Sequence, residues 1–314
     1  MLDLLRFKKE FVSLCRDELC ESGPGDMVIE ERKVNKAQRG MLNGMLFRKE
    51  GLNCAPTLYV EDFYKAYKAG SSIPDLSHQA VETVVRSLGM ANMLSAESFE
   101  RLADPVNYRV RLLYKNRNKE YLKDKPALEV GCGLAFIAEI DGGEYGAVFT
   151  DALLKETGMS KDELFDKAME STISKYPAVL HDLADSVCSR PEDCENLLEG
   201  PAVRAPAGTG PGYVLTNSSF YWGAGVLFYP GVIDRIHELL DGDFYVLPSS
   251  VHELIIMADE DQDPQQLTDL VRSANRSVVK DSEILADDLF VCRAGKLQRV
   301  SFGGVVPACA GTVC

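Results

Sequence analysis

The sequence predicts an α+β fold, with mixed or mainly antiparallel sheets, packed helices, and two or three sub-units in one compact chain. Strand-like and helix-like segments alternate unevenly, which argues against a doubly wound parallel sheet. Short apolar runs separated by glycine and proline indicate strands joined by turns. The chain has 314 residues and is 46% hydrophobic, which is enough to bury a full core.

The first expected sub-unit is an α+β unit over residues 1–125. Apolar residues at its start are three and four positions apart, as on the buried face of an amphipathic helix. Glycine-punctuated apolar runs then predict strands, and two helices follow. These expected elements cover residues 4–15, 27–59, 61–69 and 76–88. A further apolar run, YRVRLLY, leads through a charged segment to the boundary before Pro126.

The second expected sub-unit, residues 126–198, pairs strands with one helix. The run ALEVGCGLAFIAEI has the apolar character of a buried strand or strand-turn, and YGAVFT continues it. Ser160 followed by Glu163 is a capping box, which predicts a helix running to about Thr172. The Gly- and Pro-rich run over residues 199–212 is predicted to be a linker.

The last expected unit covers residues 213–298, and residues 299–314 form a tail. YVLT, GAGVLFY, FYVL and LFVC are predicted strands, and a helix is expected over residues 231–240. A second helix begins after Asp263, which is a good N-cap residue and is followed by Pro264 in the first turn.

Charge and cysteine content narrow the possible functions. The formal net charge is −14, so we expect no nucleic-acid partner, because phosphate contacts need clustered Lys and Arg. The nine cysteines never occur as Cys-x-x-Cys, which predicts reduced thiols in a cytoplasmic protein. No apolar run approaches the ~20 residues of a membrane span, and the charged start does not resemble a signal peptide, so no membrane association is expected.

The segment DFYVLPSSVHELIIMAD places Ser249, Ser250, His252 and Glu253 directly after an apolar run. A His-Glu pair is typical of zinc peptidases, but the second histidine of that motif is replaced by Ile256. A serine hydrolase is a further candidate, although Ser250 and His252 would be ~7 Å apart on an extended strand. The same residues also match a capping box, with Ser250 as N-cap and Glu253 three positions later, which predicts a helix.

A glycine turn provides a second candidate site. Gly131 and Gly133 follow a strand-like run, and Asp151 lies twenty residues after Gly131. This pattern resembles the first motif of class I S-adenosylmethionine methyltransferases, in which glycines allow close backbone approach and the acid binds the ribose. The competing interpretation is a hairpin, with a strand ending near Ile140, the turn DGGE and a returning strand.

No metal site and no cofactor are predicted. Asp259, Asp261 and Asp263 alternate like the first ligands of a calcium-binding loop. Pro264 occupies the position of the required glycine, and Leu270 occupies that of the bidentate Glu, so the calcium loop is rejected.

The chain as a whole resembles a bacterial family of unknown function, the domain of unknown function 5688, found largely in Firmicutes. The resemblance runs over roughly residues 11–290. It is carried by the segments PTLYVEDFYKAYKAG, DELFDKAMEST, YVLTNSSFYWGAGVLFYPGVIDRI and FYVLPSSVHELI. It implies relatives without implying a reaction, and the Gly131–Gly133 segment in that family is an ordinary strand.

The sequence therefore favours a non-catalytic binding or regulatory module. Asn217 and the segment Pro248 to Glu253 both follow strand-like runs, so we expect them to emerge at the same sheet edge and to bind a protein or peptide. Binding is expected to involve Asn217, Pro248, His252 and Glu253. The alternative is an enzyme, either a Ser/His hydrolase at residues 249–253 or a methyltransferase at the glycine turn.

Overall fold

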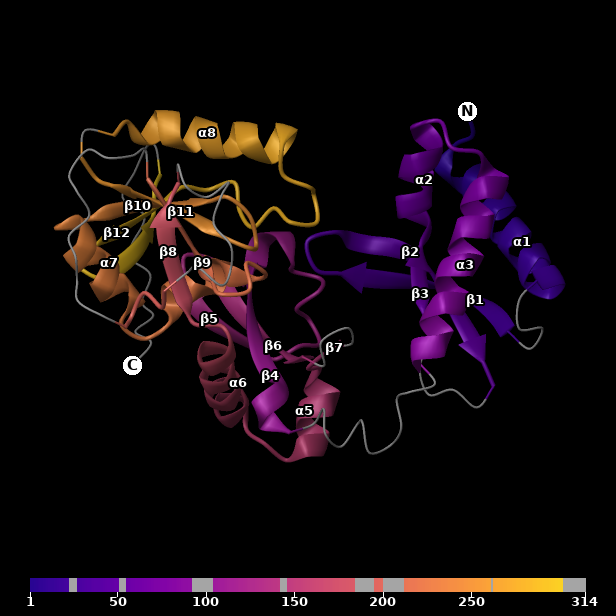
Figure 1. Cartoon of the computed structure of the whole chain (residues 1–314), viewed down its shortest axis with the longest axis horizontal. Coiled ribbons are helices and arrows are strands. Elements are labelled where there is room, and N and C mark those ends of the chain that lie inside the picture. The colour runs from indigo at the N-terminus through magenta and orange to yellow at the C-terminus, as the bar shows by residue number, and fades with distance from the viewer. Residues whose placement is uncertain are drawn as a thin grey trace. The chain divides into compact units, whose positions relative to one another are not determined.

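In the computed structural model, the chain forms two compact units, Met1–Arg101 and Leu102–Cys314. Every strand pair among the described residues is antiparallel and helices accompany the sheets in each unit, which confirms the α+β class (Figure 1). The structure describes residues 1–22, 27–50, 55–91, 104–141, 146–183, 195–199, 212–260 and 262–301. The expected linker, apart from its two end residues, and the tail beyond residue 301 lie outside these ranges.

The two units divide between residues 101 and 102, before the boundary expected at residue 125. β4 (Tyr108–Tyr114) pairs with β6 (Leu134–Asp141) across that position. β8 (Ala178–Asp182), from the expected middle unit, pairs with β9 (Tyr213–Asn217), from the expected last unit. Pairing between distant segments therefore joins the expected middle and last units into one.

In the described residues of the first unit, three helices accompany a three-stranded sheet of order β1-β2-β3. Its elements are α1 (Leu4–Ser22), β1 (Met27–Lys36), β2 (Gly40–Lys49), β3 (Thr57–Tyr59), α2 (Val60–Lys68) and α3 (Ile73–Ala91). Phe7 and Phe11, from the predicted apolar stripe of α1, are fully buried and stack on each other. They share a core with Met45 and Phe47 of β2, so the stripe is the face by which α1 joins the unit.

The second unit contains two sheets. β5 (Ala127–Gly131) and β4 flank β6, and β7 (Gly146–Val148) also pairs with β6. The six-stranded sheet has the order β13-β12-β10-β11-β9-β8. Its remaining strands are β10 (Phe244–Pro248), β11 (Leu254–Ala258), β12 (Phe290–Arg293) and β13 (Lys296–Arg299). The helices are α5 (Asp151–Thr157), α6 (Lys161–Lys175), α7 (Val232–Leu240) and α8 (Pro264–Ser277), with short 3₁₀ helices η1 (Pro105–Asn107), η2 (Lys115–Arg117) and η4 (Gly223–Phe228).

The central strand β10 explains why its sequence is continuously apolar. All five of its residues are buried. Phe244 and Val246 point into the large core that the two sheets share. Tyr245 and Leu247 point the other way, into a smaller core with residues of α8. Successive side chains of a strand face opposite sides, so a strand covered on both faces has no polar positions.

Local signals for helix starts are confirmed. Ser160 and Glu163 form the predicted capping box, in which the Ser160 hydroxyl accepts from the Glu163 N–H and the Glu163 carboxylate accepts from the Ser160 N–H. Asp263 caps α8 by accepting from the N–H of Gln265. Both contacts involve residues two or three positions apart, so they form without help from the rest of the fold.

The expected strand GAGVLFY is instead the 3₁₀ helix η4, and all of its residues are buried. Glycine makes this close packing possible. A Cβ on Gly223 would lie 2.6 Å from the His252 carbonyl oxygen, and a Cβ on Gly225 would lie 2.8 Å from the Phe136 ring. The apolar run is thus a buried 3₁₀ helix inside the core. The apolar pattern of a short segment alone does not distinguish a buried helix from a buried strand.

Gly223→Ala is expected to lower the free energy of unfolding by about 1–3 kcal/mol, as overpacking of a core does. The new methyl group would meet the backbone oxygen of His252 at 2.6 Å and the Thr216 hydroxyl at 2.3 Å. Urea denaturation measures the change. Gly242→Ala is the matched control, because a Cβ there meets nothing within 4 Å. Equal stability of the two variants would contradict the proposed close packing.

Candidate functional site

Residues 249–253 form the loop of a hairpin between β10 and β11. The Ser250 N–H donates to the Glu253 carbonyl oxygen at 3.2 Å. The His252 N–H donates to the Ser250 hydroxyl at 3.0 Å, and the Ser249 hydroxyl donates to a Glu253 carboxylate oxygen at 3.1 Å. Hydrogen bonds between its own residues therefore hold the conformation of the loop.

The helix predicted from the capping box at Ser250 and Glu253 is wrong. The residues that follow are β11, which pairs with β10 on one side and β9 on the other. The run LIIMA contains two β-branched residues, and its ladder partners on both sides satisfy the backbone of a strand. Tertiary pairing thus overrides a local capping signal.

The expected meeting of the two loops is confirmed. β9 and β10 both run antiparallel to β11, so they run parallel to each other and end at the same edge of the sheet. Asn217 ends β9 and Pro248 ends β10. The hydroxyl of Thr216 donates to the His252 carbonyl oxygen at 2.8 Å, which ties the loop after β9 to the hairpin.

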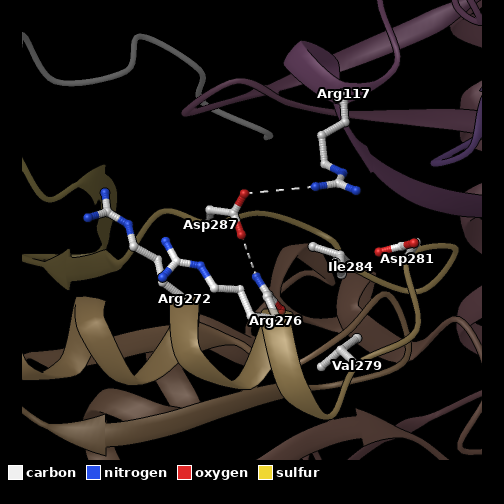
Figure 2. Close-up of a pocket in the computed structure, with 8 residues that line it drawn as sticks. Arg117, Arg272, Arg276, Val279, Asp281, Ile284 and Asp287 are labelled. Atoms are coloured by element: carbon white, nitrogen blue, oxygen red, sulfur yellow. Dashed lines mark hydrogen bonds and ion pairs between the residues drawn. The ribbon is translucent and has the colours of Figure 1, made fainter.

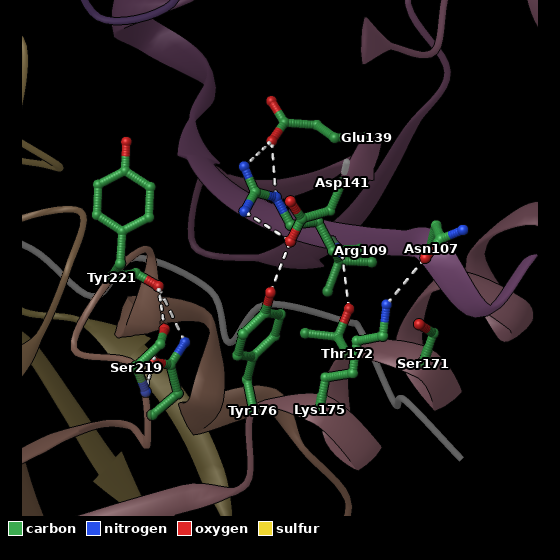
Figure 3. A network of polar contacts seen from close by, with 12 residues as sticks. Asn107, Arg109, Glu139, Asp141, Ser171, Thr172, Lys175, Tyr176, Ser219 and Tyr221 are labelled. Atoms are coloured by element: carbon green, nitrogen blue, oxygen red, sulfur yellow. Dashed lines mark hydrogen bonds and ion pairs between the residues drawn. The ribbon is translucent and has the colours of Figure 1, made fainter. Parts of the chain in front are cut away.

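Asn217 organises the loop that it begins. Its side-chain oxygen accepts from the Ser219 N–H at 3.0 Å, and its side-chain NH₂ donates to the Tyr221 carbonyl oxygen at 3.0 Å. The Ser219 hydroxyl also donates to the Tyr221 carbonyl oxygen, at 3.4 Å (Figure 3). Asn217 is 3% exposed, so its role is to hold the loop rather than to offer a free amide to a ligand.

Three rings meet where the loop and the hairpin touch, and we call Tyr221, Trp222 and His252 the aromatic edge. The His252 ring stacks on Tyr221 with centroids 4.9 Å apart and lies 5.2 Å from Trp222. The backbone N–H of Trp222 donates to Nδ1 of His252 at 3.1 Å. Tyr221 is 51% exposed, so the edge presents a fixed aromatic ring to solvent.

The environment of His252 favours the neutral imidazole. Burial lowers the pKa of His252 below its ordinary value, although Glu283 and Glu253 act in the opposite direction. A neutral ring whose Nδ1 accepts a hydrogen bond carries its proton on Nε2.

The serine hydroxyls near His252 are not arranged as nucleophiles. A base that activates serine needs an orienting carboxylate on its Nδ1–H. Here Nδ1 is an acceptor from the backbone, and among the described residues no carboxylate is hydrogen-bonded to the ring. Ser249 and Ser250 make their hydrogen bonds within the loop. The geometry therefore resembles a structural turn.

The glycine turn lies in another hairpin. Gly131, Cys132 and Gly133 all have positive φ angles and reverse the chain between β5 and β6, which pair antiparallel. The DGGE turn itself lies largely outside the described residues, but β6 and β7 on either side of it pair as the hairpin interpretation requires. Asp151 is the exposed first residue of α5, where Thr150 is the N-cap. The strand-turn-helix needed for the methyltransferase alternative is therefore replaced by a strand pair.

A buried charge network near the aromatic edge was missed from the sequence. Arg109 contacts Glu139 at 3.2 Å and Asp141 at 3.1 Å, and the hydroxyl of Tyr176 donates to Asp141 at 2.6 Å (Figure 3). Arg111 binds the other Glu139 oxygen at 2.9 Å. Burial alone would lower the pKa of Arg109, but Glu139 and Asp141 raise it above its ordinary value.

The charge network reaches the aromatic edge through Arg111. The Arg111 guanidinium lies 4.4 Å from the centre of the Trp222 ring, a cation–π contact. A signal for this network was present in the sequence. Arg109 and Arg111 alternate with apolar residues in β4, and Glu139 and Asp141 alternate in the same way in β6. Only the register that places Arg109 opposite Glu139 reveals that the two pairs meet.

In the part of the chain that the structure describes, no cluster of three His, Cys, Asp or Glu side chains is placed to hold a metal ion. Asp261 lies outside the described residues, and Asp259 binds Arg293 at 2.8 Å. None of the described helices has the length and apolar character needed to cross a membrane.

Comparison with known proteins identifies relatives. A family model, the family of unknown function DUF5688, matches residues 8–293. The chain belongs to this family. Membership in DUF5688 confirms the resemblance inferred from the sequence, and it supplies no reaction. No curated protein and no solved structure matches the chain.

The lowered pKa of His252 predicts a pH dependence of stability. Because the folded state disfavours the charged ring, the free energy of unfolding should fall as the pH decreases below the ordinary value of 6.5. His252→Asn keeps an acceptor for the Trp222 N–H and does not titrate. Urea denaturation from pH 7.5 to 5.5 should show a shallower pH slope for this variant, by at most about 1.4 kcal/mol per pH unit.

Other groups contribute equally to both proteins in that comparison and cancel. His78 is one of them, since Glu18 raises its pKa and gives it the opposite pH dependence. Identical slopes for wild type and His252→Asn would show that the ring is not desolvated in the folded state.

Glu139→Gln is expected to destabilise the second unit by about 3 kcal/mol, because it removes the carboxylate that the partly buried Arg109 and Arg111 share and leaves Asp141 to pair with Arg109 alone. The side chain of Glu139 is 7% exposed. Glu129→Gln breaks an ion pair with Lys115 in which the carboxylate is 68% exposed, and should cost less than about 1 kcal/mol. Urea denaturation compares them, and similar losses would refute a buried network.

Proposed function

We propose that this protein is a non-catalytic binding module that holds a peptide segment of a protein partner on the aromatic edge. The observation that carries the proposal is the state of Tyr221. The residue is 51% exposed, yet its ring stacks on His252 and its carbonyl oxygen accepts from the Asn217 side chain. A large ring that is both exposed and fixed is suited to contact a partner rather than to fill a core.

The elements behind the ring support the same role. Trp222 is held between the His252 ring and the Arg111 guanidinium, and Arg111 is anchored by Glu139. Tyr, Trp and Arg are the residue types that most often dominate binding energy at protein interfaces. Because these side chains are already ordered, binding loses little conformational entropy, which favours affinity.

The two enzyme alternatives receive less support. A hydrolase would need Ser249 or Ser250 activated by His252, and the hydrogen bonds of both serines stay within the hairpin loop. A methyltransferase would need a helix after Gly133, where β6 begins instead. A binding module needs neither a serine activated by His252 nor a helix after Gly133.

We place the protein in the cytoplasm as part of this proposal. Cys15, Cys20 and Cys292 are free thiols in the structure. Burial raises the pKa of both Cys15 and Cys292 to about 12, so these thiols are inert packing groups in a reducing environment.

Selection from a random peptide library displayed on phage tests the proposed function. Peptides enriched on the wild-type protein should bind Tyr221→Ala at least tenfold more weakly, which corresponds to about 1.4 kcal/mol. Fluorescence anisotropy with a labelled synthetic peptide measures the affinity.

Leu270→Ala is the matched control, because Leu270 is a similarly exposed large residue, 56% accessible, on α8 of the same unit. Its affinity should equal that of wild type. Failure to enrich any peptide, or equal affinity of Tyr221→Ala and wild type, would rule out the aromatic edge as the binding surface.

A further inference from the structure

A pocket lies between α8, the segment that follows it and η2, all in the second unit. Its volume is about 490 Å³. Figure 2 shows Arg272 and Arg276 rising from α8 on one side and Arg117 reaching in from the other. Asp287 lies between them, and Val279 and Ile284 supply apolar wall.

The pocket gathers positive charge that the protein leaves largely uncompensated. Within the part of the chain that the structure describes, the side chains of Arg272 and Arg276 make no hydrogen bond or ion pair. Arg117 reaches Asp287 only at 3.8 Å, and its buried Nε has no hydrogen-bond partner in the described residues. Three guanidinium groups therefore face two lining carboxylates, those of Asp281 and Asp287.

The positions of these charged groups favour an anion in the pocket. Arg272 and Arg276 are one helical turn apart, where like charges repel each other. Asp287 is held by the Asn275 side chain, whose NH₂ donates to it at 2.8 Å, so its position is set from the α8 side. A bound anion would relieve the repulsion between Arg272 and Arg276 and would place negative charge beside the Arg117 guanidinium.

We propose that this pocket binds the phosphate group of a small organic phosphate monoester. A phosphate dianion offers three oxygens to three guanidinium groups, and the planar donor fork of arginine matches phosphate in a bidentate way. Because the net charge of the chain is −14, a long polyanion such as a nucleic acid is repelled, whereas a small dianion is screened from the bulk charge.

The dimensions of the pocket argue for more than a free ion. Ligand pockets for small organic molecules span roughly 300–1,000 Å³, and this volume lies in that range. Val279 and Ile284 place apolar surface next to the arginines, where the organic part of the monoester rests. The pocket shares no lining residue with the aromatic edge, and this proposal does not depend on the function proposed for that surface.

Isothermal titration calorimetry at constant ionic strength, with phenyl phosphate, inorganic phosphate and benzoate, tests the site. Phenyl phosphate should bind the wild-type protein, and more tightly than the other two, because it combines a dianion with a ring. Arg272→Ala/Arg276→Ala should weaken phenyl phosphate binding at least tenfold. Both positions are exposed on a helix, where alanine is well tolerated, so lost binding does not reflect unfolding.

Arg6→Ala/Arg86→Ala is the matched control. It removes the same charge from two exposed helical arginines of the first unit, whose side chains are 78% and 74% accessible, and it should bind phenyl phosphate like wild type. No binding by the wild type, equal binding by the two double variants, or benzoate binding as tightly as phenyl phosphate would overturn the proposal.

Discussion

The pairing of β11 with a strand on each side is the constraint on which the rest of the second unit depends. It sets β9 and β10 parallel to each other, so both strands end at one edge of the sheet. It also holds the residues after Glu253 as a strand, which makes residues 249–253 a hairpin loop. The hydrogen bond from the Thr216 hydroxyl to the His252 carbonyl oxygen then joins the loop after β9 to the hairpin between β10 and β11.

Charged residues that contact the aromatic edge stabilise its geometry. Glu139 holds Arg111, and the Arg111 guanidinium packs on Trp222. On the far side of the network, Tyr176 of the segment after α6 binds Asp141. Buried ion pairs of this kind add little net stability, but losing one partner is costly. The network therefore favours one arrangement of β4, β6 and the ring cluster.

The two candidate sites use different parts of the same sheet assembly. The aromatic edge lies at the ends of β9 and β10. The pocket lined by Arg117, Arg272 and Arg276, here called the arginine pocket, is built on α8, which packs against β10 through Leu267 and Val271. One site presents fixed rings and the other presents unpaired charge. The two proposals therefore concern different ligand chemistry, a peptide at the aromatic edge and a small phosphate at the pocket.

Features that depend on neighbouring residues were predictable from the sequence. The capping box at Ser160 and the N-cap at Asp263 each involve contacts within three positions, and both are confirmed. The apolar stripe of α1 likewise marks the face that the helix buries. That Asn217 and Pro248 lie at the same edge of one sheet was expected because both end apolar runs, but the side-chain contacts made there were not.

Features that depend on register or on competition between distant segments were not. Ser250 and Glu253 match a capping box as well as any helix start, and only the ladder partners of β11 make that segment a strand. GAGVLFY is buried as a 3₁₀ helix because Phe136 and the His252 carbonyl leave room for glycine alone.

The sequence by itself determined the fold class, the capped helices and the family of this protein, because these follow from composition, local pattern and motif. Only the tertiary structure decided the aromatic edge, the buried charge network and the arginine pocket. Each joins residues from segments far apart in the chain, such as Arg117 and Arg272, and the spacing of residues along a sequence carries no information on which distant side chains meet.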